Sequence, residues 1–239
     1  MLKQIFGKIW LVWSILIFIL SWLPAALAYF VAYRLLPASK KYKNGFAVSK
    51  VWGRLINLFV GVRLREYGKE DIDFSQQYVM VCNHRSQIDI PINFVSSPVQ
   101  FVILAKQSAA KIPVIGINLR NAHVLVNRKD KEDRKRSLNT LRKHLKAGQT
   151  LLIYPEGRRL RGEDQLGPFH DGAFLLAKEA GVPILPITIV GSDRINNPKR
   201  PLEVFPGRVD VYYDAPISTE GSLSETKAEV RAVLAGHLS

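Results

Sequence analysis

Hydrophobic positions are concentrated at the start of the chain. From Ile9 to Tyr33 the sequence contains no charged residue, and Lys8 and Arg34 bound this run. A membrane-spanning helix needs about 20 apolar residues, so the run is long enough to span, but Pro24 divides it into two unequal parts. This pattern predicts a membrane anchor, which is either a straight span, a kinked helix or a helical hairpin within one leaflet.

Aromatic side chains occur throughout this run and not only at its ends. Trp and Tyr rings settle at membrane–water interfaces, so their distribution favours a shallow anchor over a clean crossing. Two other interpretations remain open: a buried core helix, and a signal peptide that is cleaved after the small residues Ala26 to Ala28. The aromatic positions are Trp10, Trp13, Trp22, Tyr29 and Tyr33.

The following stretch is basic and amphipathic. Between Arg34 and Lys69 nine basic residues face a single acid, Glu66, and apolar residues from Phe46 to Val60 follow helical spacing. Positive charge beside an anchor attracts anionic lipid, so we expect a second amphipathic helix on the membrane; a solvated helix face is the alternative. Residues 1–66 are therefore predicted to form membrane-anchoring helices, and residues 67–239 a separate domain.

From about residue 78 onward, short apolar runs alternate with amphipathic segments. The runs are rich in β-branched and aromatic residues, which favour strands. Helices are predicted at 133–146, at 172–180 and from Ser222, where a capping box with Glu225 begins. Strands are expected at 78–82, 101–104, 122–126, 151–154, 184–190 and 208–213. This alternation predicts an α/β domain with a mostly parallel mixed sheet flanked by helices, preceded by an N-terminal membrane-associated two-helix hairpin.

Composition and charge limit the class of function. The 239-residue chain is 47% hydrophobic, which excludes a disordered protein, and its one cysteine, Cys82, excludes a disulfide framework. The 34 Lys and Arg exceed the 20 Asp and Glu, a formal charge of +14. Such an excess suits nucleic acid, anionic lipid headgroups or phosphorylated substrates.

A histidine and an aspartate follow the first predicted strand of the domain. His84 comes directly after the strand, where the carboxyl ends of parallel strands assemble sites, and Asp89 follows five residues later. If the chain turns into a helix there, as Pro91 favours, Asp89 can hold one ring nitrogen of His84. The pair would then act as a general base without a serine nucleophile. Two alternatives are a loop histidine whose hydrogen bonds are purely structural, and a metal ligand. No other metal-ligand motif in the sequence supports the metal ligand.

A basic, glycine-containing loop follows the predicted strand at 151–154. It reads Pro155-Glu156-Gly157-Arg158-Arg159-Leu160-Arg161-Gly162. Guanidinium groups bind phosphate oxygens in pairs and glycine lets backbone N–H groups approach. Glu163 stands where a P-loop would carry lysine, so nucleotide hydrolysis is not supported. The loop therefore predicts an oxyanion site, with a solvated basic loop as the alternative.

These segments, in their order along the chain, resemble the 1-acylglycerol-3-phosphate acyltransferase family. The resemblance runs from about Asn83 to Ile187, and the hydrophobic N-terminus also fits. The motifs that carry it are His84-x4-Asp89, Lys106 to Gly116, Val126-Asn127-Arg128, Tyr154-Pro155-Glu156-Gly157 with Arg159, and Val182-Pro183-Ile184-Leu185-Pro186.

The resemblance implies a phospholipid-biosynthesis enzyme that moves a fatty acyl group from acyl-CoA or acyl carrier protein to the hydroxyl of a lysophospholipid, most simply lysophosphatidic acid. It implies that His84 is the base and that Asp89 orients it. By the same resemblance, the acceptor's phosphate is bound by Arg159 and Arg128 with Lys106, while Glu156 and Gly157 shape the floor of the site. No metal or cofactor is implied, and the partners are membrane lipids and the two substrates.

Two departures from the family pattern concern the acceptor. Arg158 and Leu160 stand where the family usually has Thr and Ser, and His170 stands where a lysine is usual. Another lyso-lipid acceptor, or a non-catalytic membrane adaptor on the same fold, are alternatives. Nucleic-acid binding by the basic segment from Arg128 to Lys146 is disfavoured by the hydrophobic N-terminus. We expect a membrane-associated protein whose catalytic domain faces the cytoplasm.

Overall fold

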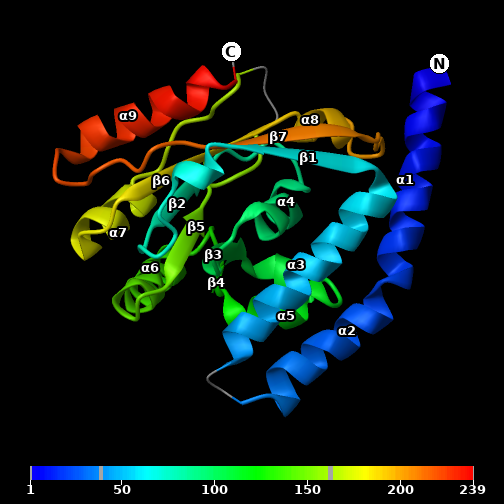
Figure 1. The fold of residues 1–239 in the computed structure, drawn as a ribbon, viewed down its shortest axis with the longest axis horizontal. Helices are drawn as coiled ribbons and strands as arrows, with labels where there is room; N and C mark the ends of the chain where they lie inside the picture. The colour runs from blue at the N-terminus through cyan, green and yellow to red at the C-terminus, as the bar shows by residue number, and fades with distance from the viewer. Residues whose placement is uncertain (1, 38–39, 161–163, 239) are drawn as a thin grey trace.

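One seven-stranded sheet organises the computed structural model, which describes residues 2–37, 40–160 and 164–238. The strand order is β1-β7-β6-β2-β5-β3-β4 (Figure 1). All neighbouring strands are parallel except β6 and β7. The strands are β1 (Val62–Tyr67), β2 (Val79–Cys82), β3 (Phe101–Lys106), β4 (Val124–Val126), β5 (Thr150–Ile153), β6 (Ile184–Val190) and β7 (Gly207–Tyr213).

Helices cover both faces of the sheet, and each face has its own apolar cluster. On one face lie α3 (Lys41–Val60), α4 (Asp89–Ser96) and α5 (Ile115–Ala122), and on the other lie α6 (Lys131–Lys146), α7 (Gly172–Ala180) and α9 (Leu223–Gly236) (Figure 1). The short α8 (Ser192–Ile195) follows β6, and brief helical turns occupy η3 (Lys69–Asp71) and η4 (Gln107–Lys111). The predicted mostly parallel α/β class is confirmed.

Local sequence signals explain several helix ends. The side chain of Asp130 caps α6 by accepting hydrogen bonds from the backbone N–H groups of Glu132 and Asp133. Ser222 and Glu225 form the predicted capping box at the start of α9. The helix predicted at 172–180 is α7, and Gly181 ends it in the left-handed conformation.

The N-terminal segment forms a hairpin with α3. Its first arm comprises α1 (Leu2–Leu20), α2 (Trp22–Phe30) and a short π-helical turn, η1 (Val31–Leu35), and α3 returns beside it (Figure 1). The arm breaks at Ser21, not at Pro24 as the sequence suggests. Pro24 lies in the first turn of α2, where a missing N–H costs no hydrogen bond.

Hydrogen bonds and close packing hold α1 on the domain. The indole N–H groups of Trp10 and Trp13 donate to the carbonyl oxygens of Val60 (2.9 Å) and Phe59 (2.8 Å), which lie at the end of α3. These carbonyls have no partner within their own helix, so the indoles satisfy them. The backbone of Gly7 also accepts a hydrogen bond from the N–H of Val204 (3.1 Å).

Most of the hairpin's apolar side chains are exposed. The stretch Leu2–Leu35 is long and apolar enough to cross a membrane by length and composition, and only 17% of its most apolar window is buried. Exposed apolar area on this scale marks an interaction surface, so the hairpin indicates membrane association. Its outermost side chains include Leu2, Ile9, Val12, Leu20, Leu23, Leu27, Leu35 and Leu58.

The predicted boundary at residue 66 falls inside a strand. β1 was not predicted, and it pairs in parallel with β7 over six residue pairs, from Val62 with Gly207 to Tyr67 with Tyr212. Only the single residue Gly61 separates α3 from β1. The hairpin is therefore joined to the sheet without a flexible linker.

Candidate active site

The side chains of His84 and Asp89 meet at the carboxyl end of β2. The Nδ1 atom of His84 lies 2.8 Å from Oδ2 of Asp89. The aspartate is fully buried, whereas 12% of the histidine side chain is exposed. Because Nδ1 donates to the carboxylate, Nε2 is the nitrogen left to accept a proton. In the described part of the chain, Nε2 has no hydrogen-bond partner.

The backbone around His84 fixes the position of the aspartate. Oδ2 of Asp89 also accepts hydrogen bonds from the N–H groups of Arg85 (2.8 Å) and Ser86 (2.7 Å). Asp89 is the first residue of α4, and Pro91 lies in the first turn, as predicted. The carboxylate therefore takes its place before any substrate arrives.

An aromatic ring supports the histidine from one side. The ring of Tyr154, directly after β5, stacks on that of His84 with centroids 4.2 Å apart and planes at 24°. The Tyr154 hydroxyl accepts a hydrogen bond from Nδ2 of Asn93 in α4 (2.9 Å), and burial raises the pKa of this hydroxyl. Sequence analysis did not assign Tyr154 or Asn93 to the site, although the place of Tyr154 at a strand's end was a usable signal.

Glu156 connects the two loops of the site. Its Oε1 accepts the N–H of His84 (2.9 Å) and its Oε2 the N–H of Gly167 (2.9 Å). Burial raises the pKa of its carboxyl, and the two backbone hydrogen bonds oppose that rise. Both oxygens are already engaged, so Glu156 braces the loop that carries His84 and leaves substrate contact to other groups.

The glycine after Glu156 has a conformation that other residues avoid. Gly157 has φ +66°, and an added Cβ would lie 2.9 Å from Cδ2 of His170. Its carbonyl accepts a hydrogen bond from the guanidinium of Arg128, which follows β4. The structure thus brings Arg128, Gly157 and Glu156 together at one edge of the sheet.

The remaining predicted cations lie along the same edge. Lys106 ends β3, beside β5, and its side chain is exposed. Arg159 is half-buried and follows the loop of Glu156. Within residues 2–37, 40–160 and 164–238 neither side chain has a hydrogen bond or an ion pair. Arg161 of the same loop lies outside the described residues.

Arg85 is a further cation of the site that sequence analysis did not single out. Its guanidinium pairs with Asp193 of α8 (3.0 Å) and donates to the carbonyl oxygen of Asp164 (2.5 Å). These contacts tie the residue after His84 to the loop beyond Glu156. Arg85 therefore stabilises the entrance of the site and does not add a free charge to it.

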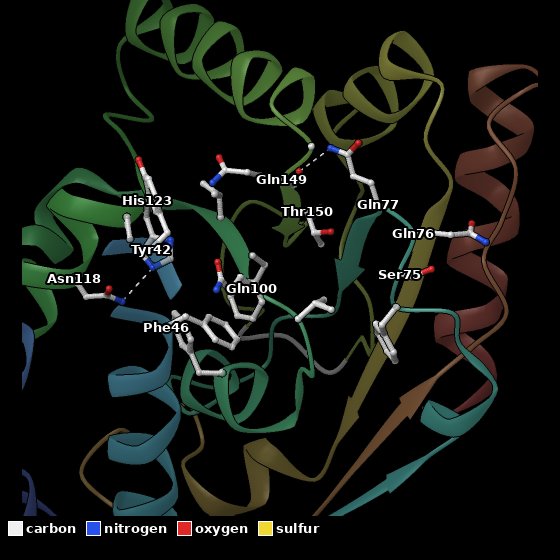
Figure 2. Close-up of a pocket in the computed structure, with 17 residues that line it drawn as sticks. Tyr42, Phe46, Ser75, Gln76, Gln77, Gln100, Asn118, His123, Gln149 and Thr150 are labelled. Carbon is white, nitrogen blue, oxygen red and sulfur yellow. Dashed lines mark hydrogen bonds between the residues drawn. The ribbon is translucent and has the colours of Figure 1, made fainter. Parts of the chain in front are cut away.

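A cavity of about 260 Å³ lies at the opposite edge of the sheet. It opens beside the amino ends of β3 and β5, and the Nε2 atom of His123 lies 3.1 Å from Nδ2 of Asn118 there. Burial lowers the pKa of His123 to about 3, and the nearby His144 adds to this effect. Figure 2 shows that the side chains around it include Tyr42, Phe46, Gln76, Gln77, Gln149 and Thr150.

The structure is that of an α/β protein with a hydrogen-bonded His–Asp pair at the carboxyl edge of its sheet. The acyltransferase family model matches residues 63–190, which is more than half of the chain. The chain belongs to this acyltransferase family. The matched range contains every predicted site residue, from His84 to Arg159.

Comparisons with individual proteins agree with this family. The chain is 31% identical over 62% of its length to the 1-acyl-sn-glycerol-3-phosphate acyltransferase of Helicobacter pylori, and 32% identical over 67% to the alpha enzyme of Mus musculus. These alignments span 61% and 57% of those relatives. The crystal structure of the lysophosphatidic acid acyltransferase PlsC from Thermotoga maritima matches with a TM-score of 0.81 at 22% identity, covering 99% of this chain and 95% of that one. The structural likeness supports the fold, including the hairpin.

Proposed function

We propose that the protein transfers a fatty acyl group from a thioester to the free hydroxyl of lysophosphatidic acid and so forms phosphatidic acid. The observation that carries the proposal is the His84–Asp89 pair, with Nδ1 held at 2.8 Å and Nε2 left open. Membership of the acyltransferase family and the names of the relatives support the same reaction.

In this mechanism Nε2 of His84 takes the proton of the acceptor hydroxyl while its oxygen attacks the thioester carbonyl carbon. The tetrahedral intermediate then collapses, the carbon–sulfur bond breaks, and the proton passes from His84 to the leaving thiolate. The products are an ester and a free thiol. Asp89 stabilises the imidazolium that exists between the two proton transfers.

The acceptor's phosphate is assigned to the cations at the same edge of the sheet. Arg159 and Lys106 have no partner in the described part of the chain, so each can bind a phosphate oxygen without breaking an existing contact. Arg128 joins them if its bond to Gly157 rearranges. The hairpin delivers the lipid from the membrane, with the domain on the cytoplasmic side.

Acyl transfer from labelled acyl-CoA to lysophosphatidic acid tests the proposal. We expect product from the wild type and a loss of at least 100-fold for His84→Ala; equal product from both would exclude His84 as the base. A panel of other lysophospholipid acceptors tests the identity of the acceptor. Faster transfer to one of them than to lysophosphatidic acid would make that lipid the preferred acceptor. Arg159→Ala should raise the KM of the acceptor more than that of the donor, and the reverse would remove Arg159 from the phosphate site.

A further inference from the structure

The loop between α8 and β7 presents an exposed leucine beside the membrane hairpin. We call residues 196–206, which connect these two elements, the 196–206 loop. Leu202 in this loop is 69% exposed, and the exposed Lys199 and Arg200 stand just before it. A single exposed leucine is ordinary on a protein surface, so its place in the structure decides what it indicates.

Hydrogen bonds within the loop hold Leu202 at the tip of a turn. The N–H of Glu203 donates to the carbonyl oxygen of Arg200 (3.1 Å), which makes Pro201 and Leu202 the two central residues of a tight turn. From the start of the loop, Nδ2 of the buried Asn196 donates to the carbonyl oxygen of Glu203 (3.1 Å). The loop is therefore ordered before it meets a partner, and contact through Leu202 costs little conformational entropy.

The loop packs on α1, the first helix of the hairpin (Figure 1). The N–H of Val204 donates to the carbonyl oxygen of Gly7 (3.1 Å), and the ring of Phe205 stacks on that of Phe6 with centroids 6.3 Å apart. Gly7 makes room for this ring, because an added Cβ would lie 2.5 Å from Phe205. The ammonium group of Lys3 lies 5.8 Å from the centroid of the same ring. A bilayer that covers the exposed face of α1 therefore extends to the loop.

The start of the loop is joined to the residues that follow His84. The hydroxyl of Ser86 donates to the carbonyl oxygen of Asn196 (2.8 Å), and both residues are buried. Arg85 pairs with Asp193 (3.0 Å) in α8, which leads into the loop. One short segment thus contacts the hairpin at one end and the catalytic edge at the other. A membrane contact made by this loop would hold the catalytic edge at a set distance from the bilayer surface.

The charges around the turn indicate an anionic lipid surface as the partner. From Arg194 to Arg208 the sequence has four basic residues and a single acid, Glu203. Lys3 and Lys8 add positive charge on the adjoining part of α1. Basic residues close to an anionic leaflet are attracted to its headgroups, whereas one leucine offers too little apolar surface for a stable protein interface. The bilayer that holds the hairpin therefore fits this loop better than a second protein does.

We propose that the 196–206 loop is a second membrane contact of the protein, in addition to the hairpin. Leu202 enters the interfacial layer of an anionic bilayer, and Lys199 and Arg200 lie among the lipid headgroups. The contact orients the domain so that its catalytic edge stays close to the surface that contains a lipid acceptor. It does not depend on which lysophospholipid the protein acylates.

A fluorescent label at position 202 tests this contact directly. The chain's one cysteine, Cys82, is buried, so the thiol of Leu202→Cys can be labelled selectively with an environment-sensitive dye. The matched control is Leu175→Cys, which replaces another exposed leucine, on α7. Ile9→Cys, on the exposed face of α1, reports whether the hairpin has entered the bilayer. Each labelled full-length chain is placed in vesicles of phosphatidylcholine and phosphatidylglycerol, with and without lipid that carries a nitroxide quencher near its headgroup.

We expect the quencher lipid to lower the fluorescence of the labels at positions 9 and 202 by about twofold or more, and to leave the label at position 175 nearly unchanged. In vesicles of phosphatidylcholine alone, quenching at position 202 should weaken while that at position 9 persists. Equal quenching at positions 202 and 175, or quenching at position 9 alone, would overturn the inference. Absence of quenching at position 9 would overturn it as well, because the loop is placed at the membrane by the hairpin.

Activity at the vesicle surface gives a second readout. Leu202→Asp should slow acyl transfer to an acceptor in vesicles about tenfold, since a charge replaces a buried leucine, and Leu202→Met should resemble the wild type. In detergent micelles all three proteins should agree within about twofold, because no flat surface has to be matched. An equal loss in micelles would assign Leu202 a structural role and overturn the inference. Quenching at position 202 in a protein that transfers no acyl group would support the contact and refute the proposed function instead.

Discussion

Replacing Asp89 by asparagine removes one negative charge beside His84 and keeps the shape of the side chain. Oδ2 of Asp89 accepts three hydrogen bonds, at 2.8 Å from Nδ1 of His84, 2.8 Å from the N–H of Arg85 and 2.7 Å from that of Ser86. The amide oxygen of asparagine can keep the two backbone bonds. The change therefore acts mainly on the imidazolium that forms during the reaction.

The size of the effect follows from the separation of the two charges. Two unit charges about 4 Å apart attract each other by about 4 kcal/mol at an effective dielectric constant of about 20. Each 1.36 kcal/mol of barrier is a factor of about ten in rate, so kcat should fall about 1000-fold in Asp89→Asn. The free energy of unfolding should change by less than about 2 kcal/mol, because the backbone bonds remain.

A double-mutant cycle separates positioning from any independent role of Asp89. Labelled acyl transfer is measured for the wild type, Asp89→Asn, His84→Ala and the double variant, and urea unfolding confirms that each is folded. If Asp89 acts through His84, the asparagine change costs nothing further once His84 is absent. A similar slowing in both backgrounds, or a drop of less than threefold in the wild-type background, would refute the reasoning.

Three further predictions concern stability. Glu156→Gln should destabilise the fold by about 1–3 kcal/mol in urea unfolding, because an amide cannot accept the N–H groups of both His84 and Gly167; an unchanged midpoint would contradict this. Gly157→Ala should lower the free energy of unfolding by about 1–2 kcal/mol in the same assay, because its φ of +66° is unfavourable for alanine. The control is Gly148→Ala, because Gly148 has a similar φ of +77° but lies in open space. It measures the backbone cost without the contact that a Cβ at position 157 would make with His170. His123 has a pKa of about 3 when folded and an ordinary value of 6.5, so the unfolded state gains a proton first as the pH falls. Stability should therefore be complete above pH 6.5 and drop by roughly 2 kcal/mol at pH 5, with a smaller slope in His123→Gln; equal slopes would contradict the assignment.

The parts of the fold that could be predicted depend on neighbours in sequence. The strands at the centre of the sheet can be recognised in the sequence as apolar runs. The capping box that begins at Ser222 can be recognised because it is complete within four residues. β1 could not be found in this way, because its exposed arginines read as part of a basic membrane stretch. What makes Val62–Tyr67 a strand is its parallel pairing with β7, far away along the chain.

The candidate site also has some features that neighbours in sequence predict and others that depend on tertiary contacts. His84 and Asp89 could be paired from sequence because five residues and one turn bring them together. The support from Asn93 through the hydroxyl of Tyr154 depends on a tertiary contact between α4 and the residue that follows β5, which no local pattern encodes. For Glu156, the sequence predicted its place in the site, but only the structure shows that both oxygens serve the backbone.

The pairing of β1 with β7 sets an order of events during synthesis. The hairpin leaves the ribosome first, yet β7, which completes its attachment to the sheet, begins only at Gly207. At roughly 5–20 residues per second, the roughly 140 residues between β1 and β7 take about 7–30 s to make. During that time the apolar arm can pack against α3 but not against the completed sheet. The exposed apolar side chains of the arm are therefore available to the bilayer before the sheet that carries His84 is complete.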